Sequence, residues 1–271
     1  MRRMFSGAAV FLLSVAGVAN AQSLDSLPRP AMLLPGSLSV SVGTLAPAEP
    51  GNVIGSATAE QGFTAFRFGR AFVVGFVDIT RRHDSDGLSW YRTTPVVVGA
   101  KLVAVTSGGV FQAAVGVAGN AGDRALRAEK ALYASYWTNW RADVVSTRSS
   151  ALPDAFPGHL YASSGWVTAA EPGNWITTLS LQQGVTLARH HRLAAIPFIG
   201  VGATADTAEY TWNNRLQADA GAKLAVSIPS GVIEVGAAQR HQQEWLTGRS
   251  RSGPVFFANL WIGWAPRFST R

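Results

Sequence analysis

The sequence predicts an all-β protein: an antiparallel transmembrane β-barrel of about twelve strands (ten to twelve). The first reason is composition, because only 14% of the 271 residues are charged and 47% are hydrophobic, whereas a typical soluble domain has about 25% charged residues. The second is that apolar residues alternate with small or polar residues in many short segments. The third is that tryptophans lie near the ends of these segments, as in the aromatic girdles of membrane barrels: Trp166, Trp175, Trp212, Trp245, Trp261 and Trp264.

The first 21 residues have the three parts of a secretory signal peptide. Arg2 and Arg3 form a basic start, residues 8–18 are apolar, and Ala19-Asn20-Ala21 is a small-residue cleavage site. A membrane anchor helix is the alternative, but the apolar run is shorter than the ~20 residues that a span needs. We therefore expect export to the cell outer membrane. The expected division is 1–21 signal peptide, 22–36 Pro-rich N-terminal arm and 37–271 barrel.

The alternation is clearest from Leu216 to Ile228, where every second residue is apolar or alanine. A period of two places the apolar residues on one face of a strand and the others on the opposite face. Residues 126–141 also fit a helix, because Leu, Ala, Glu and Lys favour helices. Along the chain the pattern predicts strands at 37–46, 53–59, 63–81, 88–106, 110–119, 126–141, 158–170, 174–188, 192–204, 214–228, 231–243 and 254–267.

The connections alternate in length in the second half of the chain. Residues 189–191 and 229–231 are short turns, whereas 205–213 and 244–253 are longer and polar. Membrane barrels have short periplasmic turns and long external loops, and the connection at 142–157 departs from that rule. A soluble β-sandwich in the periplasm is the competing interpretation. We favour the membrane barrel because the polar faces consist of Gly, Ser, Thr, Gln and isolated charges.

Six polar or charged residues project from the less apolar strand faces, and we expect them to line the lumen. Side chains of both signs there either pair and narrow the lumen or set a selectivity field. Because Asp219, Lys223 and Glu234 fall on neighbouring strands, a salt-bridge cluster is the simpler expectation and a transport site the alternative. The expected lumen-lining residues are Lys101, Gln217, Asp219, Lys223, Glu234 and Arg240.

Residues 248–253 are expected to form an external loop that carries Arg249 and Arg251. Guanidinium groups suit phosphate contacts with lipopolysaccharide, and a solvated loop is the alternative. The 23 Lys and Arg outnumber the 16 Asp and Glu but are scattered singly, which argues against a nucleic-acid partner. The expected partners are outer-membrane lipid and lipopolysaccharide, together with polysaccharide-export or other envelope proteins.

No residue pattern indicates catalysis, a cofactor or a metal site. The absence of cysteine excludes a disulfide scaffold, a zinc finger and a thiol nucleophile. His190 and His191 are adjacent, so on a strand they point to opposite faces and cannot share one ion. His159 and Ser163 share a face but lie about 13 Å apart at ~3.3 Å per residue. Residues 84–87 begin like a calcium loop, yet a proline stands where an EF-hand needs its glutamate, so we expect a hairpin turn.

Three segments, RLAAIPFIGVGATAD, RLQADAGAKLAVSIPSGVIEVGAAQRHQQEW and SGPVFFANLWIGWAP, follow one another between residues 158 and 266. In pattern and order this stretch resembles the C-terminal barrel domain of NfrA-like phage-adsorption and exopolysaccharide-export outer-membrane proteins. The resemblance implies an outer-membrane barrel with no catalytic signature. Such proteins often carry a long helical-repeat periplasmic region that this sequence does not contain, so the resemblance implies a free-standing barrel.

These patterns predict a non-catalytic outer-membrane β-barrel. Its expected role is a small channel, or the membrane part of a surface-polymer export or adsorption system. Two alternatives remain open: a membrane-embedded lipid hydrolase that uses His159 and Ser163, and a periplasmic structural β-protein. Fold alone does not choose among them, because barrels serve many functions.

Overall fold

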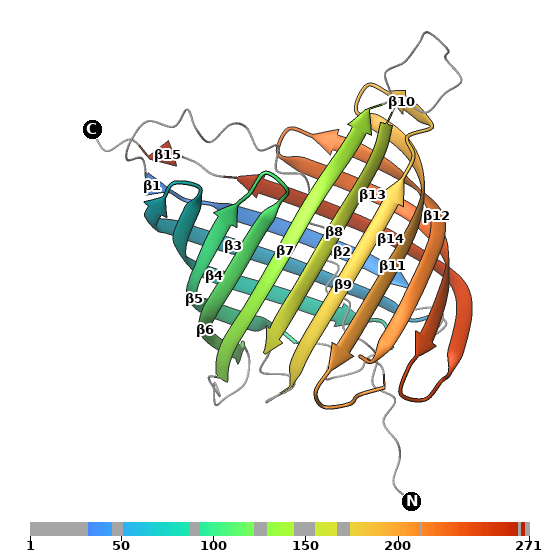
Figure 1. The fold of residues 1–271 in the computed structure, drawn as a ribbon, viewed down its shortest axis with the longest axis horizontal. Helices are drawn as coiled ribbons and strands as arrows, with labels where there is room; N and C mark the ends of the chain where they lie inside the picture. Colours follow the sequence, from blue (N-terminus) through green and yellow to red (C-terminus); the bar gives the residue numbers. More distant parts are fainter. Residues whose placement is uncertain are drawn as a thin grey trace, which may run out of the picture.

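The alternating segments form the strands of one closed antiparallel sheet (Figure 1). The computed structural model describes residues 32–44, 51–86, 93–121, 129–143, 155–166, 174–211, 213–264 and 267–268. Strands that follow one another along the chain pair antiparallel, and β14 pairs with β2 to close the barrel. The predicted fold class, an antiparallel barrel of twelve strands, is thereby confirmed. The predicted signal peptide lies outside the described residues, among which no helix is long and apolar enough to cross a membrane.

Closure leaves no long unpaired strand edge, which so apolar a sheet would otherwise expose. The short β10 (Ala188–His190) continues β9 alongside β11. The twelve barrel strands are β2 (Gly36–Thr44), β3 (Val53–Phe68), β4 (Ala71–Asp84), β5 (Pro95–Val105), β6 (Val110–Asn120), β7 (Glu129–Asp143), β8 (Ala155–Trp166), β9 (Trp175–Gly184), β11 (Leu193–Asp206), β12 (Arg215–Ile228), β13 (Gly231–Glu244) and β14 (Ser250–Trp264).

The two ends of the barrel differ in the length of their connections. At one end, called here the short-turn end, the strands are joined by residues 69–70, 106–109, 191–192 and 229–230. The connection 144–154 lies at this same end and is the long exception that the sequence indicated. At the opposite end, the long-loop end, the connections are 45–52, 85–94, 121–128, 167–174, 207–214 and 245–249.

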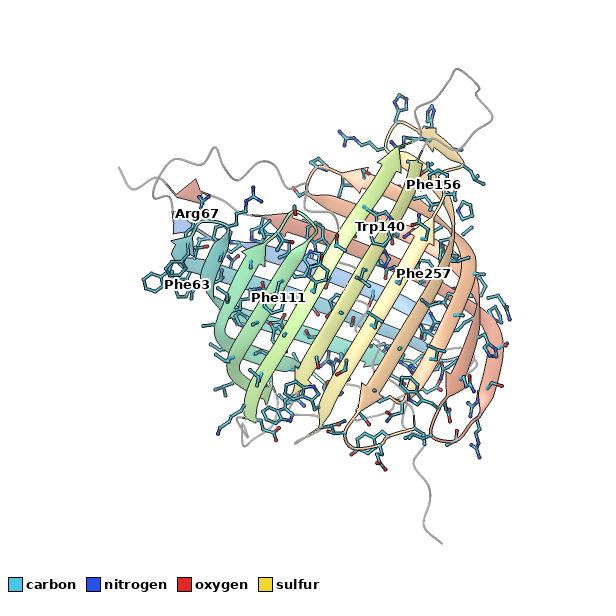
Figure 2. The ribbon with its side chains drawn as sticks, viewed as in Figure 1. Phe63, Arg67, Phe111, Trp140, Phe156 and Phe257 are labelled. Atoms are coloured by element: carbon cyan, nitrogen blue, oxygen red, sulfur yellow. The ribbon has the colours of Figure 1, made fainter. Side chains whose placement is uncertain are left out.

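The outer face of the barrel is apolar. Val115 and Ile199, near the middle of β6 and β11, are 59% and 66% exposed. Figure 2 shows Phe63 projecting away from the ribbon, and its labelled neighbours Phe111, Trp140 and Phe156 lie on the outer face near the short-turn end. At the long-loop end Trp166 and Trp175 pack edge to face, with ring centroids 5.1 Å apart. Aromatic side chains therefore gather at both ends of an apolar wall, as they do at the two interfaces of a bilayer.

Not every predicted girdle tryptophan belongs to this outer face. Trp264 lies on it at the short-turn end, and Trp245 is exposed in the connection after β13. Trp261 pairs with Val232 and shares the face of Asn259, so it points inward. Trp212 lies outside the described residues. The prediction for Trp261 was wrong because nearness to a strand end does not fix the face of the strand.

The predicted boundary between the strands 53–59 and 63–81 was wrong. Residues 60–62 continue β3, and the turn is formed by Gly69 and Arg70, with Gly69 at φ 58°. The N–H of Gly62 donates to the carbonyl of Pro35 over 2.7 Å, so this glycine is part of the ladder rather than a turn. A register shift between Thr64 and Phe66 breaks the period of two and hid the continuation. Residues 129–143, which overlap the stretch 126–141 that also fitted a helix, form strand β7.

The barrel consists of two copies of a six-stranded unit. The first copy runs from β2 to β7 and the second from β8 to β14. From β2 to β6 the sequence matches the second copy at an offset of 122 residues, and β4 and β11 correspond end to end. In the last strands, β7 and β14, the offset is 124, which aligns Trp140 with Trp264. The identical pairs include Asn52 and Asn174, Gln61 and Gln183, Phe76 and Phe198, Asp84 and Asp206, and Lys101 and Lys223.

The two seams between the copies are stabilised by the same contact. The indole N–H of Trp264 crosses Gly36 and donates to Gln61 Oε1 over 3.1 Å. At the other seam Trp140 crosses Gly158 and donates to Gln183 Oε1 over 2.9 Å. A Cβ at either glycine would lie 2.4 Å from the indole ring, so both seams require glycine beneath tryptophan. The repeated contact shows that the copies are equivalent in three dimensions as well as in sequence.

The described part of the Pro-rich N-terminal arm lies outside the lumen. Met32 and Leu33 form β1 (Met32–Leu33), which pairs with β15 (Arg267–Phe268) as a separate two-stranded sheet. Pro35 continues the ladder towards β3 through the Gly62 N–H. Both short strands lie at the short-turn end, beside the barrel wall (Figure 1). The remainder of the arm, 22–31, lies outside the described residues.

Candidate functional site in the barrel interior

The first copy places a lysine ion pair on the inner wall. Lys101 on β5 points inward, and its Nζ lies 2.5 Å from Glu60 Oε1 on β3. The ammonium also lies 5.3 Å from the centroid of the Phe76 ring on β4. Asp78 stands directly opposite Glu60 across the β3–β4 pair. The lysine therefore balances a wall that would otherwise carry two adjacent carboxylates.

The second copy repeats this arrangement with one exchange. Lys223 on β12 lies 2.7 Å from Gln182 Oε1 and 2.8 Å from Glu234 Oε1, and 5.8 Å from the centroid of Phe198. Gln182 is the equivalent of Glu60, and Gln112 of the first copy is the equivalent of Glu234. Each copy thus keeps a carboxylate among these positions, but in a different place.

A further ion pair lies nearer the long-loop end. The guanidinium of Arg240 donates two hydrogen bonds to the carboxylate of Asp219, from Nε over 2.7 Å and from the Nη2 amine over 2.8 Å. The two residues are directly opposite on β13 and β12. Such bidentate pairs are strong and hold both side chains in one geometry. The expected cluster of Asp219, Lys223 and Glu234 is therefore divided between two separate pairs.

All six residues expected in the lumen lie on the inner face of the barrel. Side-chain exposure is low for each of the charged ones, because they are folded against the wall and against one another. Gln217 is buried beside the Asp219–Arg240 pair. These residues are Lys101, Gln217, Asp219, Lys223, Glu234 and Arg240. The ion pairs that they form link strands across the inner wall: β5 with β3, and β12 with β13.

The interior holds a cavity of about 150 Å³ that is lined mostly by the second copy and also by β2 of the first. Its floor includes Phe198 and Phe257, whose rings pack edge to face with centroids 6.0 Å apart. Figure 2 labels Phe257, which lies behind the front wall of the barrel. The cavity extends to Thr44 and Arg215, which occupy the long-loop ends of β2 and β12. Polar lining side chains include His159, Tyr161, Gln182, Gln217, Asp219 and Asn259.

The space for this cavity comes from glycine. Gly200 and Gly202 of β11 face inward against Asp219 and Gln217. The equivalent positions of the first copy are Asp78 and Thr80, which carry side chains into the interior. A Cβ built on Gly200 would make only ordinary contacts, the nearest at 3.5 Å. Sequence reasoning missed this site, and comparison of the two copies is the signal that reveals it.

The residues considered for catalysis do not form a catalytic arrangement. His159 and Ser163 both face inward on β8, but His159 stands opposite Gln182 and Ser163 opposite Thr178, four positions apart along the strand. That separation, about 13 Å, exceeds hydrogen-bond reach. His190 ends β10 and His191 begins the adjoining turn, where it has φ 52°. Among the described residues no group of three or more His, Asp or Glu side chains is placed to hold a metal ion.

Arg249 and Arg251 differ in their setting. Arg249 is exposed in the connection between β13 and β14, at the long-loop end. Arg251 is exposed but belongs to β14, opposite Gln242, so only part of the predicted loop 248–253 is loop. Gln242 faces the lumen, which places Arg251 on the lumen side of the rim. At the same end of the barrel, Arg249 is therefore exposed on the connection, whereas Arg251 lies on the lumen side.

Asp206 organises the connection that follows β11 at the long-loop end. Its carboxylate accepts hydrogen bonds from the side-chain amides of Asn174, Asn213 and Asn214 at 3.0, 2.8 and 2.7 Å. It also accepts one from the backbone N–H of Tyr210 at 3.1 Å. Asp84, the equivalent residue, accepts from Asn52 at 3.0 Å. In both copies an aspartate at the end of a strand thus anchors an adjoining connection.

Asp206→Ala is expected to open residues 207–214 without unfolding the barrel. The variant removes an acceptor of four hydrogen bonds, and hydrogen bonds to charged groups contribute about 1.5–3 kcal/mol each. We expect limited proteolysis within 207–214 to accelerate at least about tenfold, following the local opening equilibrium. Asp86→Ala, at an exposed turn residue, is the control. Equal cleavage rates in the two variants would contradict the anchoring role.

Comparison with known proteins identifies no family. No family model and no curated protein matches the chain. Solved structures similar to it include the β-domain of the Bordetella autotransporter BrkA (12% identity, 87% of this chain and 100% of that one, TM-score 0.38). A second is LpxR from Salmonella typhimurium (11% identity, 83% of this chain and 99% of that one, TM-score 0.35). A third is a bacterial polysaccharide outer membrane secretin (11% identity, 88% of this chain and 99% of that one, TM-score 0.37). These similarities are too low to assign a function.

Proposed function

We propose that the chain is a non-catalytic outer-membrane β-barrel that acts as a narrow conduit: a small channel, or the membrane part of a surface-polymer export or adsorption system of the NfrA-like kind. The observation that supports this is the distribution of side chains across the wall. Large apolar side chains are exposed all around the outside, and ion pairs and amides lie inside. Soluble monomers rarely expose apolar surface on this scale.

Lipid solvation explains why such a surface persists. Within hydrocarbon every backbone N–H and C=O must pair inside the protein, and a closed antiparallel barrel satisfies that requirement. A signal peptide at 1–21 would deliver the chain across the inner membrane. Arg249 at the long-loop end would then meet lipopolysaccharide phosphates. Envelope proteins of a polymer-export system would be its protein partners.

The interior supports a conduit more than a lipid hydrolase. A hydrolase would need a nucleophile in hydrogen-bond reach of its base, and His159 and Ser163 are four residues apart on one strand. Both also face the lumen, away from the lipid that a membrane-embedded hydrolase would process. The paired charges instead resemble the lining of a constricted passage, in which fixed side chains of both signs set selectivity.

Fractionation with heat-modifiable gel migration tests the proposal. We expect the protein in outer-membrane fractions, with unheated and boiled samples migrating differently because the closed barrel resists detergent until it is heated. Bilayer conductance of the purified barrel then distinguishes an open passage from a plugged one. Recovery in the soluble periplasm with no difference between the unheated and boiled samples would refute the proposal and favour a periplasmic β-protein.

A further inference from the structure

We infer that the cavity in the second copy binds one uncharged sugar ring, which enters from the long-loop end. This rests on the proposed function, since it names the class of molecule that the conduit holds. The cavity has a volume of about 150 Å³. An apolar cavity of roughly that volume accepts one benzene molecule, a six-membered ring. The cavity described here has polar walls, so the ring that suits it carries hydroxyl groups.

The second copy has gained polar side chains where the first has none. Three polar side chains of β12 and β13 that line the cavity have apolar equivalents in the first copy. The same region has lost side chains from β11, where glycines replace Asp78 and Thr80. Loss of bulk together with gain of hydrogen-bonding groups is typical of a binding site rather than of loose packing. The three polar residues are Gln217, Asp219 and Arg240, and their equivalents in the first copy are Pro95, Val97 and Ala118.

Two buried amide oxygens in the cavity wall need donors. Gln217 Oε1 and Asn259 Oδ1 have no hydrogen-bond partner within the described protein, and the two residues are 9% and 7% exposed. Both residues line the cavity. Buried acceptors are nearly always paired, because an unpaired one costs about 1–3 kcal/mol. Two ligand hydroxyls, one at each oxygen, would supply the missing donors.

The charges around the cavity favour a neutral ligand. Asp219 and Arg240 neutralise each other through their bidentate contact, and Glu234 is neutralised by Lys223. Arg215, at the long-loop end of the lining, stands directly opposite Glu244. A net anion would face two carboxylates, and a net cation would face the guanidinium groups. A hydroxyl is both donor and acceptor, so a polyhydroxylated ring can pair with amides and with charged side chains of either sign.

The apolar floor of the cavity and its position towards the long-loop end also suit a sugar ring. Phe198 and Phe257, with Ala238 and Val255, form one apolar cluster beneath the polar walls. The C–H face of a sugar ring can lie on such rings while its hydroxyls reach the walls. The lining reaches Thr44 at the long-loop end. Lys223 and Gln182, towards the short-turn end of their strands, are joined by a hydrogen bond. A sugar therefore approaches from the long-loop side.

The test uses the folded full-length barrel in detergent and ligand-detected NMR. The probes are glucose, galactose and mannose, a neutral glucan oligosaccharide, and the charged analogues glucuronic acid and glucosamine. We expect binding of at least one neutral sugar and weaker binding of both charged analogues. Binding of free hexoses assigns the site to small solutes, and binding of the oligosaccharide alone assigns it to a polymer; both support the inference.

Two variants and one control connect binding to the cavity. Gly200→Leu fills the cavity and is expected to weaken binding at least about tenfold. Asn259→Ala removes one acceptor without adding bulk and is expected to weaken it roughly fivefold. Ile199→Val, one residue away on the outer face of the same strand and outside the cavity lining, is the control and should bind as the unaltered barrel does.

The outcomes separate this inference from the proposed function. A barrel that migrates heat-modifiably and resides in the outer membrane but binds none of the neutral sugars overturns the inference alone. Equal binding by Gly200→Leu and Asn259→Ala, both shown to be folded by the same gel assay, also overturns it. A protein that binds sugar but fractionates with the soluble periplasm overturns the proposed function and leaves the site.

Discussion

Val115→Arg is expected to lower the free energy of folding into lipid vesicles by about 2–4 kcal/mol. Val115 lies at the middle of β6 and is exposed on the outer face. Arginine on the lipid face of a barrel is that costly at the bilayer midplane and costs only about 0–1 kcal/mol near the interfaces. The measurement is denaturant-induced unfolding from vesicles, followed by tryptophan fluorescence and by heat-modifiable migration.

Val53→Arg is the matched control for this position. Val53 is also exposed on the outer face but is the first residue of β3, at the long-loop end. We expect its effect to stay within about 1 kcal/mol. If the face met water, both substitutions would be ordinary surface changes within about ±0.5 kcal/mol. Equal small effects at the two positions would therefore contradict a lipid-facing wall.

Lys101→Met is expected to destabilise the barrel by about 3 kcal/mol. The variant leaves Glu60 and Asp78 directly opposite each other on the inner wall without the ammonium that lies 2.5 Å from Glu60. Removing one partner of a buried ion pair typically costs about 3–5 kcal/mol, because the remaining charge is left uncompensated. The same vesicle unfolding assay measures the loss.

The second copy suggests the compensating change. Its residue equivalent to Glu60 is Gln182, which lies against Lys223. We therefore expect Glu60→Gln combined with Lys101→Met to recover most of the lost stability. In the double variant the wall keeps only the carboxylate of Asp78, so two carboxylates no longer face each other. A double variant no more stable than Lys101→Met would show that the lysine acts through packing on Phe76 rather than through charge.

Periodicity and composition were sufficient to predict the fold, because a strand in a barrel wall has one face in lipid and one in the lumen. The alternation predicted from Leu216 onward is found residue for residue as far as Leu224 in β12, where every second side chain is exposed. The β3–β4 boundary failed for a local reason: Gly62 is a ladder residue that accommodates a neighbouring strand, and a one-residue shift follows it. Single-strand patterns carry no information about either feature.

The candidate site was predictable only in part. The inward direction of residues such as Asp219 and Arg240 followed from the alternation of side chains along a strand. That alternation does not determine which inward side chains contact one another. The cavity depends on Gly200 and Gly202, which read as ordinary strand glycines until they are compared with Asp78 and Thr80. That comparison requires the offset between the copies, which the sequence contains. The pairing of Lys223 with Glu234 required the three-dimensional register.

The connection 144–154 has a further significance in light of the two copies. It joins the last strand of one copy to the first strand of the next, so its counterparts are the two chain ends of the barrel, which lie at the same end. A unit with an even number of strands begins and ends on one side of a membrane and can be joined in tandem without passing a linker through the bilayer. The barrel is therefore built like a symmetric dimer whose two six-stranded units are joined in one chain, and the inward glycines that make room for the cavity occur in only one of the two units.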